Sequence, residues 1–390
     1  MMFKKTTLSI ATIIALSSLA SASTITLYQD RETGAIYTKP GPNRIELGDF
    51  VSAKEQYIEK QTMLSKINKK LGVKVKSGVP TLKFSGVHYL GYTYTDDQTS
   101  ANNDKSEFET RRNYLQVKAY WNKKDYMRVT LDTHHDDTGD WKVRLKYAYI
   151  YLDKILPYTG VEFGQAHRPW IDWEEHHGWL YRSIAKTFVE EDNGAHLTNS
   201  ADLGVNFKTK TDYFTSEIGL FNGEGYHGEQ VGTGMSFEWR LTANILGTGK
   251  EHVHATEDEY LDISFLGQLN SEYKGGEDLN WYGVHAVYNQ PKFLLAGMYY
   301  TSDNNNGSKE GNGYSFNGEF RPVHNWSILA RYDNWTDKSS TTDVDRTQII
   351  GGVAYTYNKN VKFIANVFDI DVEDDSTDET KYMFTTEVKW

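Results

Sequence analysis

Six basic residues recur at even spacing along three neighbouring stretches of the chain. They are Arg112, Lys118, Arg128, Lys142, Arg144 and Lys146. If each stretch forms a β-strand, the even spacing places all six on the same face, because successive side chains of a strand point to opposite sides. Facing water, they would create a local positive field that attracts anions. The alternative is that they only balance the nearby acids Glu109, Asp132 and Glu162.

A second group of charges lies in the segment 167–199, HRPWIDWEEHHGWLYRSIAKTFVEEDNGAHLTN. Its charged candidates are Arg168, Asp172, Glu174, Glu175, Arg182 and Lys186. Opposed charges across a narrow gap orient dipolar solutes and discriminate between ions. The alternative is an exposed loop with scattered charges, which would leave Trp170, Trp173 and Trp179 in water. We therefore expect the segment to fold against an inner surface.

His176 and His177, next to Glu174 and Glu175, also invite a metal interpretation. Adjacent side chains of a strand point apart, and the spacing matches no common zinc pattern. The chain has no cysteine, and we find no Gly-x-Ser-x-Gly motif for a serine nucleophile. The sequence therefore predicts no metal, no cofactor and no catalytic constellation.

The elements that position these charges are β-strands, because from Pro80 onward the hydrophobic pattern has a period of two. In SFEWRLTANI, Phe237 and Ile245 fall on one face, and Glu238 and Arg240 fall on the other. The pattern predicts about sixteen strands, an even number. They lie near 80–94, 107–122, 124–134, 139–153, 159–166, 200–208, 213–222, 234–246, 258–270, 278–289, 291–302, 311–321, 324–335, 345–358, 360–371 and 378–390.

The connections between these strands alternate in length. Long polar ones such as DDQTSANNDKSE and SDNNNGSKEGNG alternate with short ones such as NKK and NQPK. One connection on the short side, GTGKEHVHATE at 247–257, is long and breaks the rule. Short turns at one end and long loops at the other are typical of an antiparallel β-barrel that crosses a membrane. We therefore predict an all-β fold in which 80–390 forms a transmembrane barrel.

The first residues predict export. Lys4 and Lys5 precede a short apolar run over 6–19, and Ala20-Ser21-Ala22 is a small-residue cleavage site. We expect 1–22 to be a signal peptide, whose loss takes the formal charge from −11 to −13. Such an acidic chain is a poor nucleic-acid binder, because phosphate backbones require clustered positive charge. No later segment approaches the ~20 apolar residues of a membrane helix.

The segment 23–79 separates the signal from the barrel. Residues 23–49 are polar and read as irregular, whereas 50–71 carry apolar residues at a seven-residue repeat and end before Gly72. This pattern predicts one amphipathic helix. It either packs on its own domain or forms a short coiled coil that joins identical subunits.

Export and a wide barrel decide which way the strands face. A closed barrel of this size leaves an aqueous channel, so the apolar faces meet lipid and the polar faces line the lumen. Each Arg or Lys facing lipid near the midplane would cost ~2–4 kcal/mol. The chain also has 27 Tyr and 10 Trp, as expected for aromatic girdles at the two interfaces.

The last strand, TKYMFTTEVKW, places Tyr382, Phe384 and Trp390 on one face. A terminal strand that ends in an aromatic residue resembles the C-terminal signature of bacterial outer-membrane proteins. The resemblance implies that Phe384 and Trp390 form an assembly signal for the barrel assembly machinery.

As a whole, 80–390 resembles the trimeric sixteen-stranded porins. RRNYLQVKAYWNKKDYMRVTLD at 111–132 and VRLKYAYIYLDKILPYTGVEFGQAHRPW at 143–170 are similar to the phosphate-selective porins O and P. The resemblance implies a homotrimer among outer-membrane lipids of a Gram-negative bacterium, with the third loop folded inward as the constriction. It also implies passive diffusion of small hydrophilic solutes and ions, to which the basic face described above would add a preference for anions.

Four other functions are compatible with an exported barrel protein. A substrate-specific channel for a sugar or phosphate would use the same aromatic residues, so the sequence leaves it open. An outer-membrane enzyme lacks its nucleophile and base. A surface receptor would need larger outer loops, and an active transporter would need a plug domain far larger than 23–79.

Overall fold

The computed structural model describes residues 25–50, 80–99, 103–135, 138–304, 309–374 and 377–390. The chain divides into two units, Met1–Val79 and Pro80–Trp390. Within the described ranges no helix is long and apolar enough to cross a membrane.

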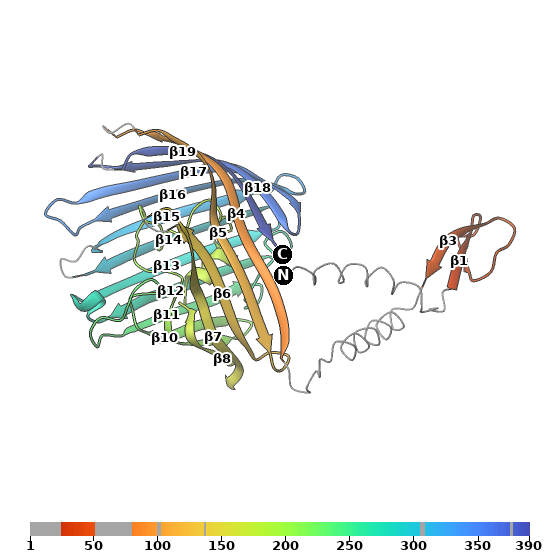
Figure 1. Cartoon of the computed structure of the whole chain (residues 1–390), viewed down its shortest axis with the longest axis horizontal. Coiled ribbons are helices and arrows are strands. Elements are labelled where there is room, and N and C mark those ends of the chain that lie inside the picture. The colour runs from red at the N-terminus through yellow and green to blue at the C-terminus, as the bar shows by residue number, and fades with distance from the viewer. Residues whose placement is uncertain (1–24, 51–79, 100–102, 136–137, 305–308, 375–376) are drawn as a thin grey trace, which may run out of the picture. The chain divides into compact units, whose positions relative to one another are not determined.

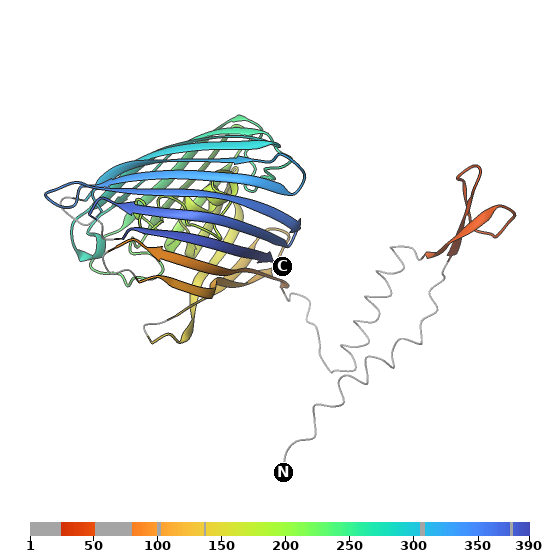
Figure 2. The same cartoon turned by 90° about the horizontal axis from the view of Figure 1, so that it is seen from above.

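The second unit is a closed barrel of sixteen strands, β4 to β19 (Figures 1 and 2), which confirms the predicted fold class. All neighbours pair antiparallel in chain order, and β19 pairs with β4 to close the ring. The strands are β4 (Thr81–Asp97), β5 (Lys105–Tyr120), β6 (Tyr126–His135), β7 (Trp141–Leu156), β8 (Thr159–His167), β9 (Ala201–Lys210), β10 (Phe214–Phe221), β11 (Ser236–Leu246), β12 (Tyr260–Asn270), β13 (Leu279–Gln290), β14 (Phe293–Asp303), β15 (Gly311–Phe320), β16 (Trp326–Asp337), β17 (Val344–Asn358), β18 (Val361–Val372) and β19 (Glu379–Lys389).

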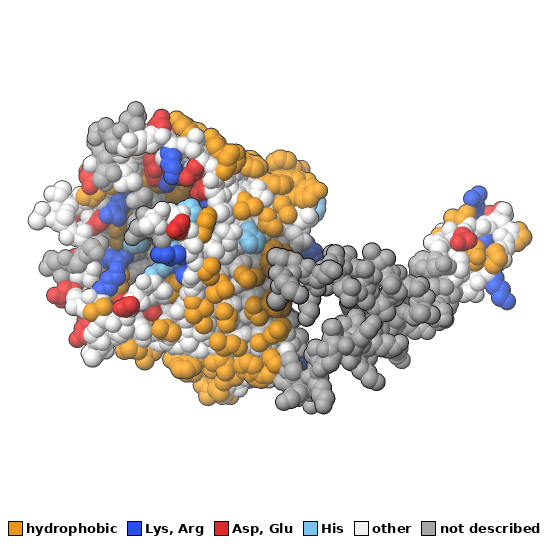
Figure 3. Space-filling view, viewed as in Figure 1, with side chains coloured by type: hydrophobic (Ala, Val, Ile, Leu, Met, Phe, Trp, Pro, Cys, Tyr) orange, Lys and Arg blue, Asp and Glu red, His pale blue; other side chains and the backbone are white. Residues whose placement is uncertain are grey.

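The two faces of the wall separate as the period of two predicts. On β11, Phe237 and Ile245 are exposed on the outside, whereas Glu238 and Arg240 are buried on the inside. Hydrophobic side chains form a band over the outer wall near the short-turn end, and charged side chains gather at the other end (Figure 3). The outer surface is thus the apolar one, as a barrel in lipid requires.

The loops also sort by length. The β5–β6, β13–β14 and β17–β18 turns are short and lie at the end of the barrel where the chain ends (Figure 1). The 247–259 connection between β11 and β12 is the long exception at this end. The opposite end carries the longer loops, apart from the β8–β9 connection, 168–200, which lies inside the barrel. It contains the α-helix α3 (Ile171–His177). A single 3₁₀ turn, η1 (Tyr273–Gly275), follows β12.

The first unit differs from its prediction. A three-stranded sheet of β1 (Ile25–Asp30), β2 (Ile36–Tyr37) and β3 (Arg44–Phe50) occupies much of the segment expected to be irregular. The β1–β2 turn is fixed by Asp30, whose Oδ1 accepts the backbone N–H groups of Glu32 and Thr33 at 3.0 Å. These strands are short and polar, so the alternation of apolar and polar residues that would predict them is weak.

Two predictions about the start of the chain are not tested. The predicted helix over 50–71 lies outside the described residues, except that its expected first residue, Phe50, ends β3. The predicted signal peptide, 1–22, also lies outside them.

Candidate functional site

The β8–β9 loop, residues 168–200, packs against the inner wall of the barrel. The Phe188 ring lies 5.7 Å from the Tyr300 ring of β14 and 6.3 Å from the Trp335 ring of β16. Trp170 packs against His285 of β13, with their ring centroids 5.0 Å apart. The predicted inward folding of this loop is therefore confirmed.

A second apolar cluster joins the same loop to β16–β19. Here Trp179 and Tyr181 pack with Leu329, Ile350 and Phe368, all of which are buried. The expectation that polar residues line the whole interior is wrong on this side of the barrel. Because the loop covers these inward positions, they meet neither lipid nor water, and apolar side chains stabilise them there.

Hydrogen bonds from the wall to loop carbonyl oxygens fix the path of the loop. They come from Asn317 to Gly178 at 3.0 Å, Arg331 to Lys186 at 2.6 Å, Arg111 to Ser183 at 3.2 Å and Tyr260 to His177 at 2.8 Å. Buried backbone carbonyls need such partners. The loop is thus held by four separate strands: β15, β16, β5 and β12.

Most of the charges predicted on the loop are paired. Arg182 contacts both Glu175, at 2.9 Å, and Glu190. Lys186 contacts Asp192 at 2.9 Å. These pairs neutralise much of the field that the loop would otherwise place across the pore.

Arg168, the first residue of the loop after β8, is buried, and its Nε donates to Glu238 of β11 at 2.9 Å. It holds the loop to the wall. A matching pair joins Arg240 of β11 to Glu217 of β10 at 3.1 Å, and the same guanidinium donates to the Pro169 carbonyl at 3.1 Å. The sequence analysis assigned Arg240 to the polar face but did not predict its pairing with Glu217, because the spacing of residues along one strand does not show which residues of another strand they contact.

Three acids of α3 were predicted as lining candidates. Glu175 is paired with Arg182, and the other two, Glu174 and Asp172, differ from each other. Glu174 is buried, and this burial raises the pKa of its carboxyl to about 8, so at neutral pH it is mainly uncharged. Asp172 keeps part of its side chain exposed, 3.8 Å from His167. Asp172 is therefore the charged acid that this turn of the loop presents to the interior.

The basic wall predicted from spacing lies on the inner face of β5–β7. Lys118 stands directly opposite Arg128 in the β5–β6 register, and Lys142 stands opposite His134 in the β6–β7 register. Lys146 is buried, and its Nζ donates to the Tyr114 hydroxyl at 2.8 Å. The spacing thus placed these basic residues on the correct face.

Some of the basic residues on this wall form ion pairs. Arg144 pairs with the buried Asp132 at 2.9 Å, and Arg112 reaches the same carboxylate at 3.8 Å. Lys118, Arg128 and Lys146 have no carboxylate within 4.0 Å among the described residues. Some of these basic residues therefore balance an acid, as the second interpretation expects, and others have no such partner. The attraction of anions by the wall stays a prediction.

Arg111 is a lining residue that the sequence analysis missed. A bulge at Tyr89/Leu90 in the β4–β5 register turns both Arg111 and Arg112 inward. Strict alternation allows only one of two neighbours to face the lumen, whereas a bulge admits both. Arg111 donates to Glu109 at 2.9 Å and to the Thr385 hydroxyl at 2.6 Å.

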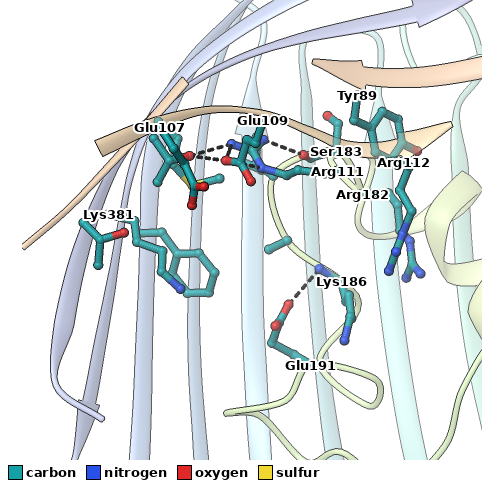
Figure 4. Close-up of a pocket in the computed structure, with 16 residues that line it drawn as sticks. Tyr89, Glu107, Glu109, Arg111, Arg112, Arg182, Ser183, Lys186, Glu191 and Lys381 are labelled. Atoms are coloured by element: carbon teal, nitrogen blue, oxygen red, sulfur yellow. Dashed lines mark hydrogen bonds and ion pairs between the residues drawn. The ribbon is translucent and has the colours of Figure 1, made fainter. Parts of the chain in front are cut away.

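A cavity of about 440 Å³ lies between the loop and this part of the wall (Figure 4). It brings together Arg112, Arg182 and Lys186, three of the predicted residues, with Arg111. Figure 4 shows Arg112 and Arg182 side by side, one from the wall and one from the loop. Cationic side chains from two elements therefore converge on one water-accessible space.

The 247–259 connection narrows the barrel from the other end. Its Lys250 carbonyl lies 3.2 Å from Nε2 of His177, and the His252 ring lies 4.2 Å from the His176 ring. Asn289 donates to its Ala255 carbonyl at 2.9 Å. The connection that broke the alternation of loop lengths thus meets α3 inside the barrel.

His176 and His177 serve this contact. The His177 ring is buried, stacks on Trp173 at 4.3 Å and lies 2.9 Å from the Trp173 carbonyl through Nδ1. The described parts of the chain bring together no group of three or more His, Cys, Asp or Glu side chains that could hold a metal ion.

Phe384 and Trp390, the predicted assembly signal, both point outward from the barrel. Each is about half exposed, Phe384 at 49% and Trp390 at 54%. The outer aromatic face of the last strand is therefore present as expected, and its role stays a prediction.

Comparisons by sequence find no match, because neither a protein-family profile nor a curated protein matches the chain. Comparisons by structure find outer-membrane porins. OmpT of Vibrio cholerae, in a trimer form folded in vitro, has a TM-score of 0.57 at 13% identity, over 80% of this chain and 100% of that one.

Two further porins have the same fold. An anion-selective porin from Comamonas acidovorans has a TM-score of 0.59 at 12% identity, over 80% of this chain and 99% of that one. OmpF of Salmonella typhi, in complex with daunomycin, has a TM-score of 0.55 at 12% identity, over 81% and 99%. At such identities the similarity is one of fold: this chain has the sixteen-stranded porin architecture.

Proposed function

We propose that this protein is an outer-membrane porin through which small hydrophilic solutes and ions diffuse passively. The observation that carries the proposal is the β8–β9 loop packed inside a closed barrel of sixteen strands. The loop fills one side of the interior with apolar packing and leaves a polar, water-accessible space against β4, β5 and β19. Such a partly filled barrel suits a size-limited channel.

We infer a preference for anions from the way the lining charges pair. The loop charges Arg182 and Lys186 have acidic partners. On the wall, Lys118 and Arg128 have none within 4.0 Å among the described residues. The uncompensated field of this lining is therefore positive, although the whole chain carries a formal charge of −11, and pore selectivity follows the lining.

Location and assembly follow from the same proposal. The apolar outer band supports a place among outer-membrane lipids (Figure 3). The signal at 1–22 would export the chain, and the outward Phe384 and Trp390 would be bound by the barrel assembly machinery. The solved porins of this fold include a trimer form, which supports a homotrimer. The function requires no catalytic residue and no cofactor.

A substrate-specific channel is the second candidate. The observation that favours it is the set of tyrosines beside the wall cations, including Tyr126 under Lys118 and Tyr147 under Arg128. A general pore needs no such arrangement. Membership of the phosphate-selective porins O and P rests on the sequence resemblance at 111–132 and 143–170 alone.

Single-channel recording of the purified protein in a planar bilayer tests both candidates. We expect conductance steps in KCl that close in threes, and a reversal potential of anion-selective sign under a salt gradient. An absence of steps would refute a porin. A cation-selective sign would refute the role of the basic wall and point instead to Asp172.

A further inference from the structure

Three cations lie in a single row across three strands of the inner wall. Lys83 of β4 stands directly opposite Lys118 of β5, and Lys118 stands directly opposite Arg128 of β6. Like charges that face each other across strands destabilise a sheet. None of the three has a carboxylate within 4.0 Å among the described residues. We call Lys83, Lys118 and Arg128 the cation row.

Neutral groups hold the cation row in place. The Arg128 guanidinium lies 4.4 Å from the centre of the Tyr147 ring and donates to the Tyr149 hydroxyl at 3.2 Å. The Lys118 ammonium lies over the Tyr126 ring, and the Lys83 ammonium lies over the Tyr120 ring, at 4.7 and 5.0 Å. A ring face attracts a cation but cannot neutralise it. The row therefore keeps its positive charge and its capacity to bind an anion.

A row of aromatic rings lies directly beside it. Tyr120, Tyr126 and Tyr151 are register partners on β5, β6 and β7, two residues along the strands from the cation row. The ring centroids are 5.0 Å apart for Tyr120 and Tyr126, and 5.2 Å apart for Tyr126 and Tyr151. All three side chains are partly exposed. We call them the tyrosine row.

The Asp153 carboxylate accepts a hydrogen bond from the Tyr151 hydroxyl at 3.5 Å, at the β7 end of the tyrosine row. The acids that act on Lys118 lie farther from the cation row. Glu251 of the 247–259 connection, Asp172 of α3 and Glu162 of β8 attract Lys118, each from beyond 4.0 Å, while Arg128 repels it. Lys118 is partly exposed on the inner wall and has no carboxylate in direct contact among the described residues.

We propose that the two rows together form a binding site for solutes that carry a carboxylate joined to a planar ring. The carboxylate would contact Lys118 and its neighbours in the cation row, and the ring would lie against the tyrosine row. A bare inorganic anion cannot stack on the tyrosine rings, and a neutral ring lacks the charge that would pair with the cations. The inference rests on the proposed porin function and adds a substrate class to it.

Block of the ionic current by added solutes tests the site. Benzoate, acetate and inorganic phosphate are added in turn to single channels recorded in KCl. We expect benzoate to reach half-block at a concentration about tenfold lower than either of the others, because it alone contacts both rows. Equal potency of benzoate and acetate, or a stronger block by phosphate, would overturn the proposal.

Two variants and a control locate the effect. Lys118→Gln should raise the half-blocking concentration of benzoate about tenfold, and Tyr126→Leu should raise it to that of acetate while leaving acetate unchanged. Lys123→Gln, in the exposed turn after β5, removes the same charge outside the row and should change nothing. Unchanged benzoate block in both row variants would overturn the proposal.

Failure of the two proposals can be told apart. Each variant is first recorded in KCl alone, where stable single-channel openings show that the barrel has folded, whatever the size of the conductance. A lack of channels at this stage, in the unmodified protein, refutes the porin function itself. Channels that conduct KCl normally but show no preference for benzoate refute the binding site alone.

Discussion

Trp390 Nε1 lies 3.0 Å from Nε2 of His88, a residue 302 positions earlier in the chain. The two rings stack with their centroids 6.4 Å apart. Two backbone hydrogen bonds of 2.9 and 3.0 Å join Trp390 to Gly86 of the same strand. The last residue of the chain thus fastens the seam where β19 meets β4 and closes the barrel.

Replacing Trp390 with alanine should weaken that seam. The variant loses the ring contact and the side-chain hydrogen bond to His88, and we expect a loss of about 1–3 kcal/mol in the free energy of unfolding. When samples are heated to a series of temperatures and then run on denaturing gels, the band of the folded protein should disappear at a lower temperature.

Trp326→Ala is the matched control for the seam. Trp326 is also an outward, half-exposed tryptophan at the short-turn end, but it packs on Tyr355 of the neighbouring strand, away from the seam. If both variants lose the same stability, lipid contact and not closure explains the effect.

Arg182→Gln should loosen the inner loop. Arg182 lies between Glu175 and Glu190. Burial raises the pKa of Glu190, but Arg182, together with Lys146 and Lys186, lowers it to about 2. Removing one partner from a buried ion pair costs about 3–5 kcal/mol, because the other charge stays buried and unpaired. We expect a noisier open-channel current as the loop moves.

The control for this change is Lys186→Gln. Its partner Asp192 is 64% exposed and can be solvated by water when the lysine is lost. Its effect on stability should stay below about 1 kcal/mol. Equal noise in the two variants would mean that the Arg182 pairs do not hold the loop.

Glu174 gives the loop a pH dependence. Burial raises its pKa from 4.5 to about 8. Because the unfolded carboxyl ionises first, this group's contribution to stability is fully present below pH 4.5 and is lost as the pH rises to about 8, by a few kcal/mol at most. Melting temperatures measured from pH 5 to pH 9 should therefore fall and then level off.

Glu174→Gln removes the ionisable group and retains the shape of the side chain. The fall in melting temperature between pH 5 and pH 8 should shrink in this variant. An unchanged pH profile would assign the dependence to other groups.

Much of the barrel could be predicted from sequence, because lipid outside and water inside impose a clear period of two on each strand. Phe237 and Glu238, side by side on β11, were assigned to the correct faces. The same rule failed at Arg111, where a bulge turns two neighbours inward. Bulges depend on pairing with the next strand, which a single strand's pattern does not contain.

The inner loop shows a second limit. Its tryptophans correctly indicated that 167–199 packs inside. Spacing could not show that Arg168 would be buried with Glu238, or that Glu174 would lose its charge. Those outcomes depend on contacts between distant segments. The uncompensated Lys118 and Arg128 were identified because they lie on regular strands.

Lys118→Glu should move ion selectivity toward cations. The change replaces an unpaired positive charge on the lumen wall with a negative one opposite Arg128. A single charge acts on a passing ion by about 1 kcal/mol through water. Because the change alters the wall by two charges, the permeability ratio should change by at least about fivefold. The reversal potential under a salt gradient measures it, and Lys123→Glu in the exposed turn is the control. A shift of equal size in both variants would contradict a selective role for the wall.

Shortening the 247–259 connection to a tight turn should widen the short-turn mouth of the pore. This connection reaches α3 through Lys250 and His252, and Arg321 fixes it to the wall by donating to the Ala255 carbonyl at 3.1 Å. Its removal opens space beside Asp172 and frees His177 on one side, so single-channel conductance in KCl should rise. Shortening the 338–343 loop at the other end is the control, and conductance there should not change. If the 247–259 deletion also leaves conductance unchanged, ion flow is limited at the β8–β9 loop alone, because that loop would then be the narrowest part of the path through the barrel.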